Sequence, residues 1–292
     1  MPYLNGKEII LYARSIAPSL GKKENYIVKF ISNNYQEIPN LSISEIAEKL
    51  QVSEASITKA CKKLKCNGFF ELKHFLEDYI SNPTTTSLKE DDEQETYSEQ
   101  DSCSSILEKV FINSMLAIQD TYSGMNATNF EAAVDLLDTV SKATKLTLIG
   151  CGGSGILCQD FQHKLLKIGI ISTMFQDTNM QFMSAALSDK NDIVLGISHS
   201  GTTKSVLEVM KLAKSHGAKT ICITNHAISP ITEIADISLH SSAQNSPLTG
   251  ENASARIAQL NILDALYTVL ALRRNNTSYS NLEKTKKSVQ SR

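Results

Sequence analysis

Four hydroxyl side chains crowd into six residues of this sequence, where an apolar run ends and a helical pattern begins. They are Ser198, Ser200, Thr202 and Thr203, with His199 and Gly201 between them. Hydroxyls donate hydrogen bonds to phosphate oxygens, and the free N–H groups of a helix N-terminus attract anions. The spacing predicts a site for a compact monophosphate. The alternative is that these hydroxyls only cap the helix and close a turn.

A glycine-rich loop follows an earlier apolar run. Gly150, Gly152 and Gly155 satisfy the GxGxxG spacing, and Asp177 stands where a dinucleotide-binding protein has its ribose-contacting acid. This pattern alone is weak, and a nicotinamide-binding oxidoreductase is one alternative. An ordinary dinucleotide fold does not need the second, hydroxyl-rich loop, so we favour a monophosphate. The first loop would contribute Gly152, Gly153 and Ser154.

The elements that must position both loops alternate between strand and helix. Expected strands are Lys145–Ile149, Gly169–Phe175, Asp192–Ile197, Lys219–Thr224 and one near Asp236–Leu239. Expected helices include Ile156–Lys167, Lys204–Ser215 and the segment that ends at Tyr267. Such alternation predicts a doubly wound parallel sheet with its ligand beyond the strand C-termini. Glu251, in the polar stretch before the last of these helices, is expected to reach the ligand or to form a salt bridge at the helix start.

The first 80 residues carry a different, all-helical pattern. Two short helices, Leu41–Leu50 and Ser53–Lys65, are separated by a turn, and Ser42 with Glu45 makes a capping box. This arrangement indicates a helix-turn-helix, whose second helix enters the DNA major groove. The alternative is a helical bundle with a solvated lysine face. The expected base-edge residues are Ser53, Glu54, Ser56 and Lys59, and the expected phosphate contacts are Lys62 and Lys63.

Charge divides the chain and limits its function. The net charge is −2 over 292 residues, which excludes a uniformly basic nucleic-acid binder but not a small basic surface. Residues 89–101 hold seven acids and one lysine, as expected of a linker. We therefore predict a DNA-binding domain over 1–80, an acidic linker over 81–105, a ligand domain over 106–272 and a polar, basic tail over 273–292 that is frayed or weakly helical.

Other features point to the cytoplasm. The sequence shows no apolar stretch long enough to span a membrane and no signal-peptide pattern at its start. None of its six cysteines forms a CxxC pair. We expect reduced, mostly buried thiols, no metal site and no cofactor.

Four stretches, in this order, resemble the RpiR family of bacterial transcriptional regulators, which join a helix-turn-helix to a sugar isomerase (SIS) domain. They are SISEIAEKLQVSEASITKACKKLKCNGFFELKHFL, IGCGGSGILCQDFQHKLLKIGI, ISHSGTTKSVLEVMKLAKSHGAKTICITN and SPLTGENASARIAQLNILDALY. The resemblance covers about residues 5–80 and 106–272. It implies an α + α/β protein with an all-helical N-terminal domain and a five-stranded, doubly wound SIS domain.

The resemblance also implies roles for single residues. Ser154 matches the serine of the first SIS loop, and Ser198, Ser200 and Thr203 match the SxSGxT loop that binds a phosphosugar. Where SIS isomerases have a catalytic glutamate, this sequence offers Gln259, and an amide cannot act as a general base. We therefore expect a non-enzymatic regulator, most simply a repressor released by a sugar phosphate.

Three partners are expected for such a regulator: operator DNA, a small sugar phosphate, and further copies of the chain in a homodimer or homotetramer. Two alternatives remain open besides the oxidoreductase. One is a phosphosugar isomerase or lyase that uses Glu251 or His199 as its base. The other is a sugar-phosphate sensor that binds another protein and not DNA.

Overall fold

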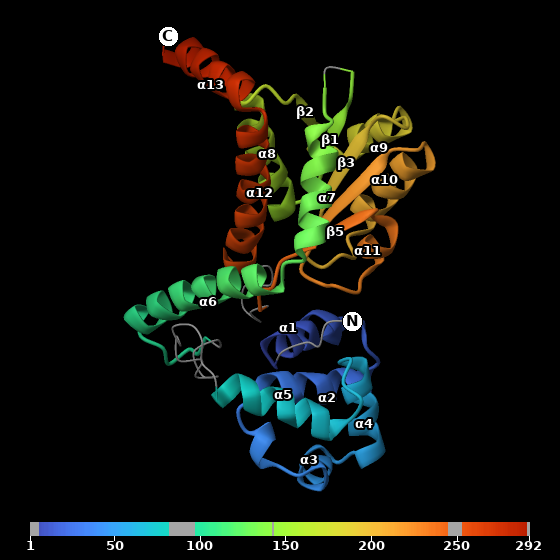
Figure 1. Cartoon of the computed structure of the whole chain (residues 1–292), viewed down its shortest axis with the longest axis vertical. Coiled ribbons are helices and arrows are strands. Elements are labelled where there is room, and N and C mark those ends of the chain that lie inside the picture. Colours follow the sequence, from blue (N-terminus) through green and yellow to red (C-terminus); the bar gives the residue numbers. More distant parts are fainter. Residues whose placement is uncertain (1–5, 82–96, 142, 245–252, 291–292) are drawn as a thin grey trace.

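The computed structural model describes residues 6–81, 97–141, 143–244 and 253–290 of the chain, so most of the expected acidic linker lies outside the described residues. The helical N-terminal domain lies below the sheet-containing domain in Figure 1, with the long helix α6 (Cys103–Gly124) between them. Helix α6 contacts α1 on one side and α12 on the other. It begins slightly before the boundary expected at residue 106, and its start is capped by Ser102.

The N-terminal domain is helical throughout its described residues, as predicted. It contains α1 (Gly6–Ile16), α2 (Lys22–Asn33), α3 (Ile43–Leu50), α4 (Glu54–Lys63) and α5 (Phe69–Ser81), with short 3₁₀ turns at Ala17–Ser19 and Ile38–Asn40. The sequence patterns did not single out α1. One buried apolar cluster holds these helices together, and its largest fully buried members are Ile9, Ile16, Ile27, Ile31, Ile38, Ile46, Ile57, Leu64, Leu72 and Leu76.

The turn between α3 and α4 has the geometry that its residues favour. The predicted capping box at the start of α3 is present: Glu45 N donates to Ser42 Oγ at 3.2 Å, and Ser42 N donates to the Glu45 carboxylate at 2.7 Å. This backbone hydrogen bond lowers the pKa of Glu45. Gln51 ends α3 in the left-handed region with φ 53°, and Ser53 caps α4 by accepting from Ser56 N. The tight turn and the two caps fix the angle between the helices.

The five predicted strands form one parallel sheet. They are β1 (Leu146–Ile149), β2 (Ser172–Met174), β3 (Ile193–Ile197), β4 (Lys219–Thr224) and β5 (Ile237–His240), and their order is β2-β1-β3-β4-β5. Ile149 pairs with Gly196, and Ile197 pairs with Ile223. The chain winds away from β1 in both directions, so the doubly wound fold is confirmed. The switch point lies between β1 and β3.

Helices cover both faces of the sheet (Figure 1). Alternate strand residues such as Leu148 and Leu195 pack against α7 (Ala127–Asp138), α8 (Gly153–Lys167) and α12 (Ala253–Arg273). Their neighbours Ile149 and Val194 pack against α9 (Thr178–Ala186), α10 (Lys204–Ser215) and α11 (Pro230–Ile234). Burial on both sides explains why these strands are continuous apolar runs.

Two C-terminal helices complete the sheet-containing domain. Among the described residues, α12 alone is long and apolar enough to cross a membrane. Its residues Ile262, Leu263, Leu266 and Leu270 are buried in the core beside the sheet, as in the central helix of a globular domain. Residues Asn275–Gln290 form a further helix, α13, within the segment expected to be a frayed or weakly helical tail. Its Asn281 side chain donates to the Ile168 carbonyl at 3.1 Å and anchors it to the end of α8.

Candidate functional site

The hydroxyl loop, residues Ser198–Thr203, joins β3 to α10 at the carboxyl edge of the sheet. Ser198 is buried, and its Oγ lies 2.9 Å from Thr203 Oγ1. Ser200 Oγ accepts from both Thr202 N at 3.2 Å and Thr202 Oγ1 at 2.9 Å. Gly201 has φ +66°, so the chain turns through the left-handed region between these hydroxyls. The hydroxyls are therefore gathered in one small loop and bonded to one another.

The two helices that follow β1 and β3 at this edge lack a side-chain cap. Thr203 is the N-cap residue of α10 and Gly152 that of α8, and neither makes a capping hydrogen bond from its side chain. By contrast, α4, α6, α7 and α9 are capped by Ser53, Ser102, Asn126 and Asp177. First-turn N–H groups without a side-chain acceptor suit an anion.

The glycines of the first loop serve different purposes. Gly152 has φ +57° and open space around the position of a Cβ, so the backbone conformation alone favours glycine there. At Gly150 a Cβ would lie 2.8 Å from the Ser154 carbonyl oxygen, and at Gly155 it would lie 3.1 Å from the Gly150 carbonyl oxygen. Because these two residues lack a Cβ, the end of β1 can approach the first turn of α8 closely. Ser154, which is buried, lies in that turn.

The structure brings the two loops together. Strands β1 and β3 are neighbours in parallel register, so both loops leave the same edge of the sheet. Cys151 Sγ of the first loop lies 3.3 Å from Ser205 Oγ in the first turn of α10. The predicted residues Gly152, Gly153 and Ser154 therefore lie beside the hydroxyl loop, as a shared phosphate site requires.

Of the two positions in or near the last helix that the sequence singled out, Glu251 and Gln259, the structure describes only Gln259. Glu251 lies outside the described residues. Gln259 on α12 is fully buried, and its Nε2 donates to Ser241 Oγ at 3.4 Å. Ser241 in turn lies 3.3 Å from the Asn225 side chain, so Gln259 belongs to a buried polar cluster beyond the carboxyl ends of β4 and β5.

Sequence reasoning did not find Gln181, which supports the first loop. This residue of α9 is fully buried, and its Nε2 donates to the carbonyls of Gly150 at 3.4 Å and Phe175 at 2.7 Å. Its Oε1 has no partner among the described residues. Asp177, the acid of the dinucleotide pattern, accepts from Met180 N and caps α9. The sequence carried a signal for Asp177, a polar residue after the second strand, but none for Gln181, whose Gly150 contact spans 31 residues.

The second helix of the helix-turn-helix, α4, presents a basic face. Three lysines of α4 are exposed: Lys59, Lys62 and Lys63. Lys59 and Lys62 share one side of the helix with the exposed Ala55, because the three residues follow helical spacing. Lys59 Nζ forms an ion pair with Glu24 of α2 at 2.8 Å, and this bond lowers the pKa of Glu24. Lys62 and Lys63 stand in the last turn, where their side chains can meet phosphates.

The polar residues at the start of α4 have structural partners. Ser53 caps the helix, and its Oγ lies 2.8 Å from Ser56 Oγ. Glu54 accepts from Ser44 Oγ of α3 at 2.8 Å. These bonds fix α4 relative to α3. To contact base edges as predicted, Ser53, Glu54 and Ser56 would have to keep these hydrogen bonds and also bond DNA, or exchange them for hydrogen bonds to DNA.

Known families match both parts of the chain. The helix-turn-helix domain of the rpiR family matches residues 7–83, and the SIS domain matches residues 139–269. The chain is 36% identical over 283 residues to the HTH-type transcriptional regulator RpiR of Escherichia coli, covering 96% of this chain and 92% of that protein. It is 27% identical over 286 residues to the regulator HexR of Pseudomonas aeruginosa, covering 97% and 96%.

Solved structures share the fold. The Vibrio vulnificus NanR protein complexed with ManNAc-6P matches 96% of this chain and 97% of its own, with a TM-score of 0.59 and 22% identity. The sugar isomerase domain of an RpiR transcription factor from Sphaerobacter thermophilus matches 62% of this chain and 98% of its own, with a TM-score of 0.55 and 19% identity. Because its N-terminal domain (residues 6–81, here called the head) and its SIS domain both match, and the RpiR relative is 36% identical over 92% of its length, the chain belongs to the RpiR family of DNA-binding transcriptional regulators.

Proposed function

We propose that a sugar phosphate bound at the hydroxyl loop controls this regulator's affinity for operator DNA, and that the genes concerned serve carbohydrate metabolism. The observation that carries the proposal is the loop itself: Ser198, Ser200 and Thr203 gather at a helix start without a side-chain cap, in a chain whose other domain is a DNA-binding head. Hydroxyls and free N–H groups together suit a phosphate dianion.

The sugar part of the ligand follows from the neighbourhood of the loop. Gln181 and Gln259 are buried amides at the carboxyl edge of the sheet, and each has an Oε1 without a partner among the described residues. Amide oxygens accept hydrogen bonds from sugar hydroxyls. The solved NanR neighbour holds ManNAc-6P, which supports a phosphorylated sugar as the class of ligand.

The proposed regulator acts as a homodimer or homotetramer in the cytoplasm. A helix-turn-helix presents one recognition helix per chain, and two such helices read a palindromic operator one DNA turn apart. Ligand control then needs a sugar phosphate that binds one arrangement of the two DNA-binding domains more tightly than the other. Its effect on DNA affinity can be no larger than that difference in sugar-phosphate affinity. We propose repression that the ligand releases.

The direct test measures DNA binding by the full chain with and without sugar phosphates. A duplex selected by the protein from a random pool is the DNA probe. The ligand panel holds ribose 5-phosphate, glucose 6-phosphate, fructose 6-phosphate and N-acetylmannosamine 6-phosphate, with the unphosphorylated sugars as controls. We expect at least one phosphate to bind in calorimetry and to lower the affinity for the duplex. No heat from any sugar phosphate across a widened panel would remove the ligand claim.

We further propose that the bound sugar phosphate is not turned over. At the position offered for the isomerase glutamate, Gln259 is fully buried and carries an amide, which does not accept a proton near neutral pH. Purified protein is expected to leave ribose 5-phosphate and glucose 6-phosphate unchanged in assays that follow ketose formation. Turnover above the uncatalysed rate, abolished by Glu251→Gln or His199→Ala, would establish the enzyme instead.

A further inference from the structure

The DNA-binding head touches the SIS domain beside the hydroxyl loop. The ring of His226, in the loop after β4, lies within hydrogen-bonding reach of the backbone of Ser15 in the last turn of α1. His226 also packs on His199 of the hydroxyl loop, with ring centroids 6.0 Å apart and the ring planes tilted by 59°. Both histidines are buried. His226 therefore contacts both the hydroxyl loop and α1, the first helix of the head.

The hydroxyl loop and the segment around His226 are joined through several bonds. The His199 carbonyl accepts from Asn225 N at 3.0 Å and from Thr224 Oγ1 at 3.2 Å. Ile231 N donates to the Gly201 carbonyl at 3.1 Å, and Ser229 Oγ donates to the His226 carbonyl at 3.1 Å. A displacement of the hydroxyl loop must therefore shift the segment that holds His226, because densely bonded and packed backbone does not deform independently.

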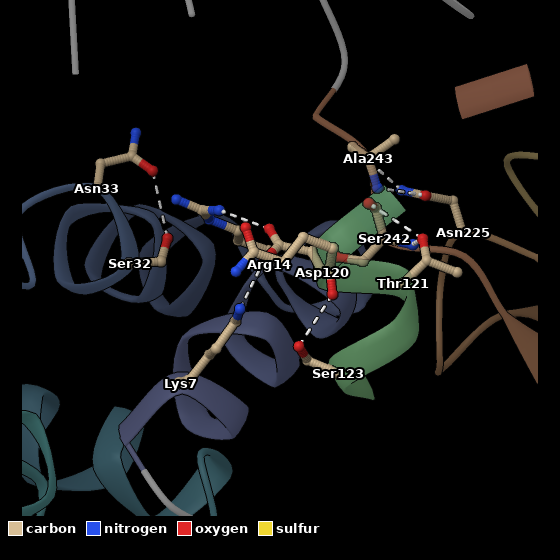
Figure 2. Close-up of polar contacts among 11 residues, drawn as sticks. Lys7, Arg14, Ser32, Asn33, Asp120, Thr121, Ser123, Asn225, Ser242 and Ala243 are labelled. Carbon is tan, nitrogen blue, oxygen red and sulfur yellow. Dashed lines mark hydrogen bonds and ion pairs between the residues drawn. The ribbon is translucent and has the colours of Figure 1, made fainter. Parts of the chain in front are cut away.

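A second connection runs from the same segment to α6 (Figure 2). The Asn225 side chain accepts from Ala243 N at 2.8 Å and donates to the Ala243 carbonyl at 2.9 Å. The adjacent Ser242 N donates to Thr121 Oγ1 of α6 at 2.9 Å. The residue before Thr121 is Asp120, which points toward the head.

Asp120 binds the head by charge. Its carboxylate lies 3.5 Å from Arg14 Nη1 and 3.7 Å from Lys7 Nζ, both on α1 (Figure 2). The Asp120 side chain is only 10% exposed, and those of Arg14 and Lys7 are 19% and 20% exposed. Solvent therefore screens these pairs less than it screens fully exposed ones. The SIS domain and α6 therefore contact α1 of the head in two places: His226 at Ser15, and Asp120 at Arg14 and Lys7.

We propose that His226 and Asp120 transmit the occupancy of the hydroxyl loop to the DNA-binding head, as the two contacts that set how α1 sits on the SIS domain. The inference rests on the proposed function. The loop hydroxyls hydrogen-bond to one another in the structure. A phosphate that binds there replaces those hydrogen bonds with hydrogen bonds from the hydroxyls to its own oxygens. The loop then adopts a new arrangement, His199 shifts against His226, and the hold on α1 changes.

The test measures a coupling factor, the ratio of the dissociation constants for the selected duplex with and without a saturating sugar phosphate from the panel. Allosteric factors of this kind are roughly 5- to 150-fold. We expect His226→Ala and Asp120→Asn each to bring the factor to about one-third of its wild-type value or lower, with sugar-phosphate affinity changed by no more than about threefold, because neither side chain belongs to the proposed ligand site. The matched controls are His163→Ala on α8 and Asp264→Asn on α12, which pairs with Lys164 away from the head.

Further variants keep the proposal falsifiable if His226→Ala folds poorly. His226→Gln keeps a hydrogen-bonding side chain but removes the ring that packs on His199, so it is also expected to lower the coupling factor. Arg14→Gln with Lys7→Gln removes both ion-pair partners of Asp120. The Arg14→Gln and Asp120→Asn effects on the coupling factor should not add, because both substitutions break the same Arg14–Asp120 ion pair.

The outcomes separate this inference from the proposed function. A wild-type protein that binds no sugar phosphate, or no duplex, overturns the proposed function and this inference with it. A wild-type factor of about five or more that persists unchanged in His226→Gln, Asp120→Asn and the Arg14→Gln, Lys7→Gln protein leaves the proposed function standing and overturns only the coupling route.

Discussion

Replacing Gly201 with alanine is expected to weaken sugar-phosphate binding by at least about 100-fold, since about 1.4 kcal/mol corresponds to a factor of ten. Gly201 has φ +66°, which costs a residue with a Cβ about 1–2 kcal/mol. The new Cβ would also overlap Ser229 Oγ and lie 2.6 Å from Ser229 Cβ and 3.0 Å from Thr224 Oγ1. The loop must then open, and its hydroxyls and N–H groups no longer converge on one phosphate.

Calorimetry with the sugar-phosphate panel measures this effect, with circular dichroism to show that the domain stays folded. Gly152→Ala separates the two causes, because Gly152 also has a positive φ (+57°) but has open space around its Cβ position. Its expected loss is about tenfold, from backbone strain alone. Gly68→Ala, where a Cβ meets nothing within 4 Å, should bind as the wild type does. Unchanged binding by Gly201→Ala would show that the phosphate does not use this loop.

The sequence predicted the parts of the fold whose physical signal is local. A strand buried on both faces must be a continuous apolar run, and Ile193–Ile197 is such a run with a helix after it. The capping box at Ser42 and Glu45 uses contacts between residues three apart, so the residue types and their spacing suffice to predict it. The proximity of the glycine-rich loop and the hydroxyl loop was also predictable, because parallel strands bring their carboxyl ends to one edge.

Features that depend on distant partners were out of reach. Gln181 lies 31 residues beyond the Gly150 carbonyl that it bonds, and nothing in its neighbourhood shows that contact. The pairing of Asp120 with Arg14 spans 106 residues and depends on how the head docks on α6. Lys59 was predicted near base edges, and its ion pair with Glu24 follows from the packing of α2 against α4. The ligand-contacting roles of Ser154, Ser198, Ser200 and Glu251 stay predictions.

Removing Lys62 and Lys63 together is expected to have the second large effect, this time on DNA. Both side chains are exposed in the last turn of α4, beyond the turn that fixes α4 on α3. Each phosphate contact contributes a slope of about 0.9 in a plot of log affinity against log salt, or roughly eightfold in affinity at about 0.1 M salt. Lys62→Ala with Lys63→Ala should therefore lower affinity by about 60-fold and reduce the slope by about two.

The control must remove the same charge from elsewhere, because a loss of two lysines also changes the long-range field of the protein. Lys284→Ala with Lys286→Ala does so on α13, which packs against α8 and α12 and not against the head. It should leave the salt slope unchanged. Lys59→Ala should cost less than either lysine of the pair, because Lys59 must first leave Glu24 to reach DNA. Equal slopes for the wild type and the Lys62, Lys63 double variant would mean that these two lysines do not contact DNA phosphates, since each lost phosphate contact must lower the salt dependence.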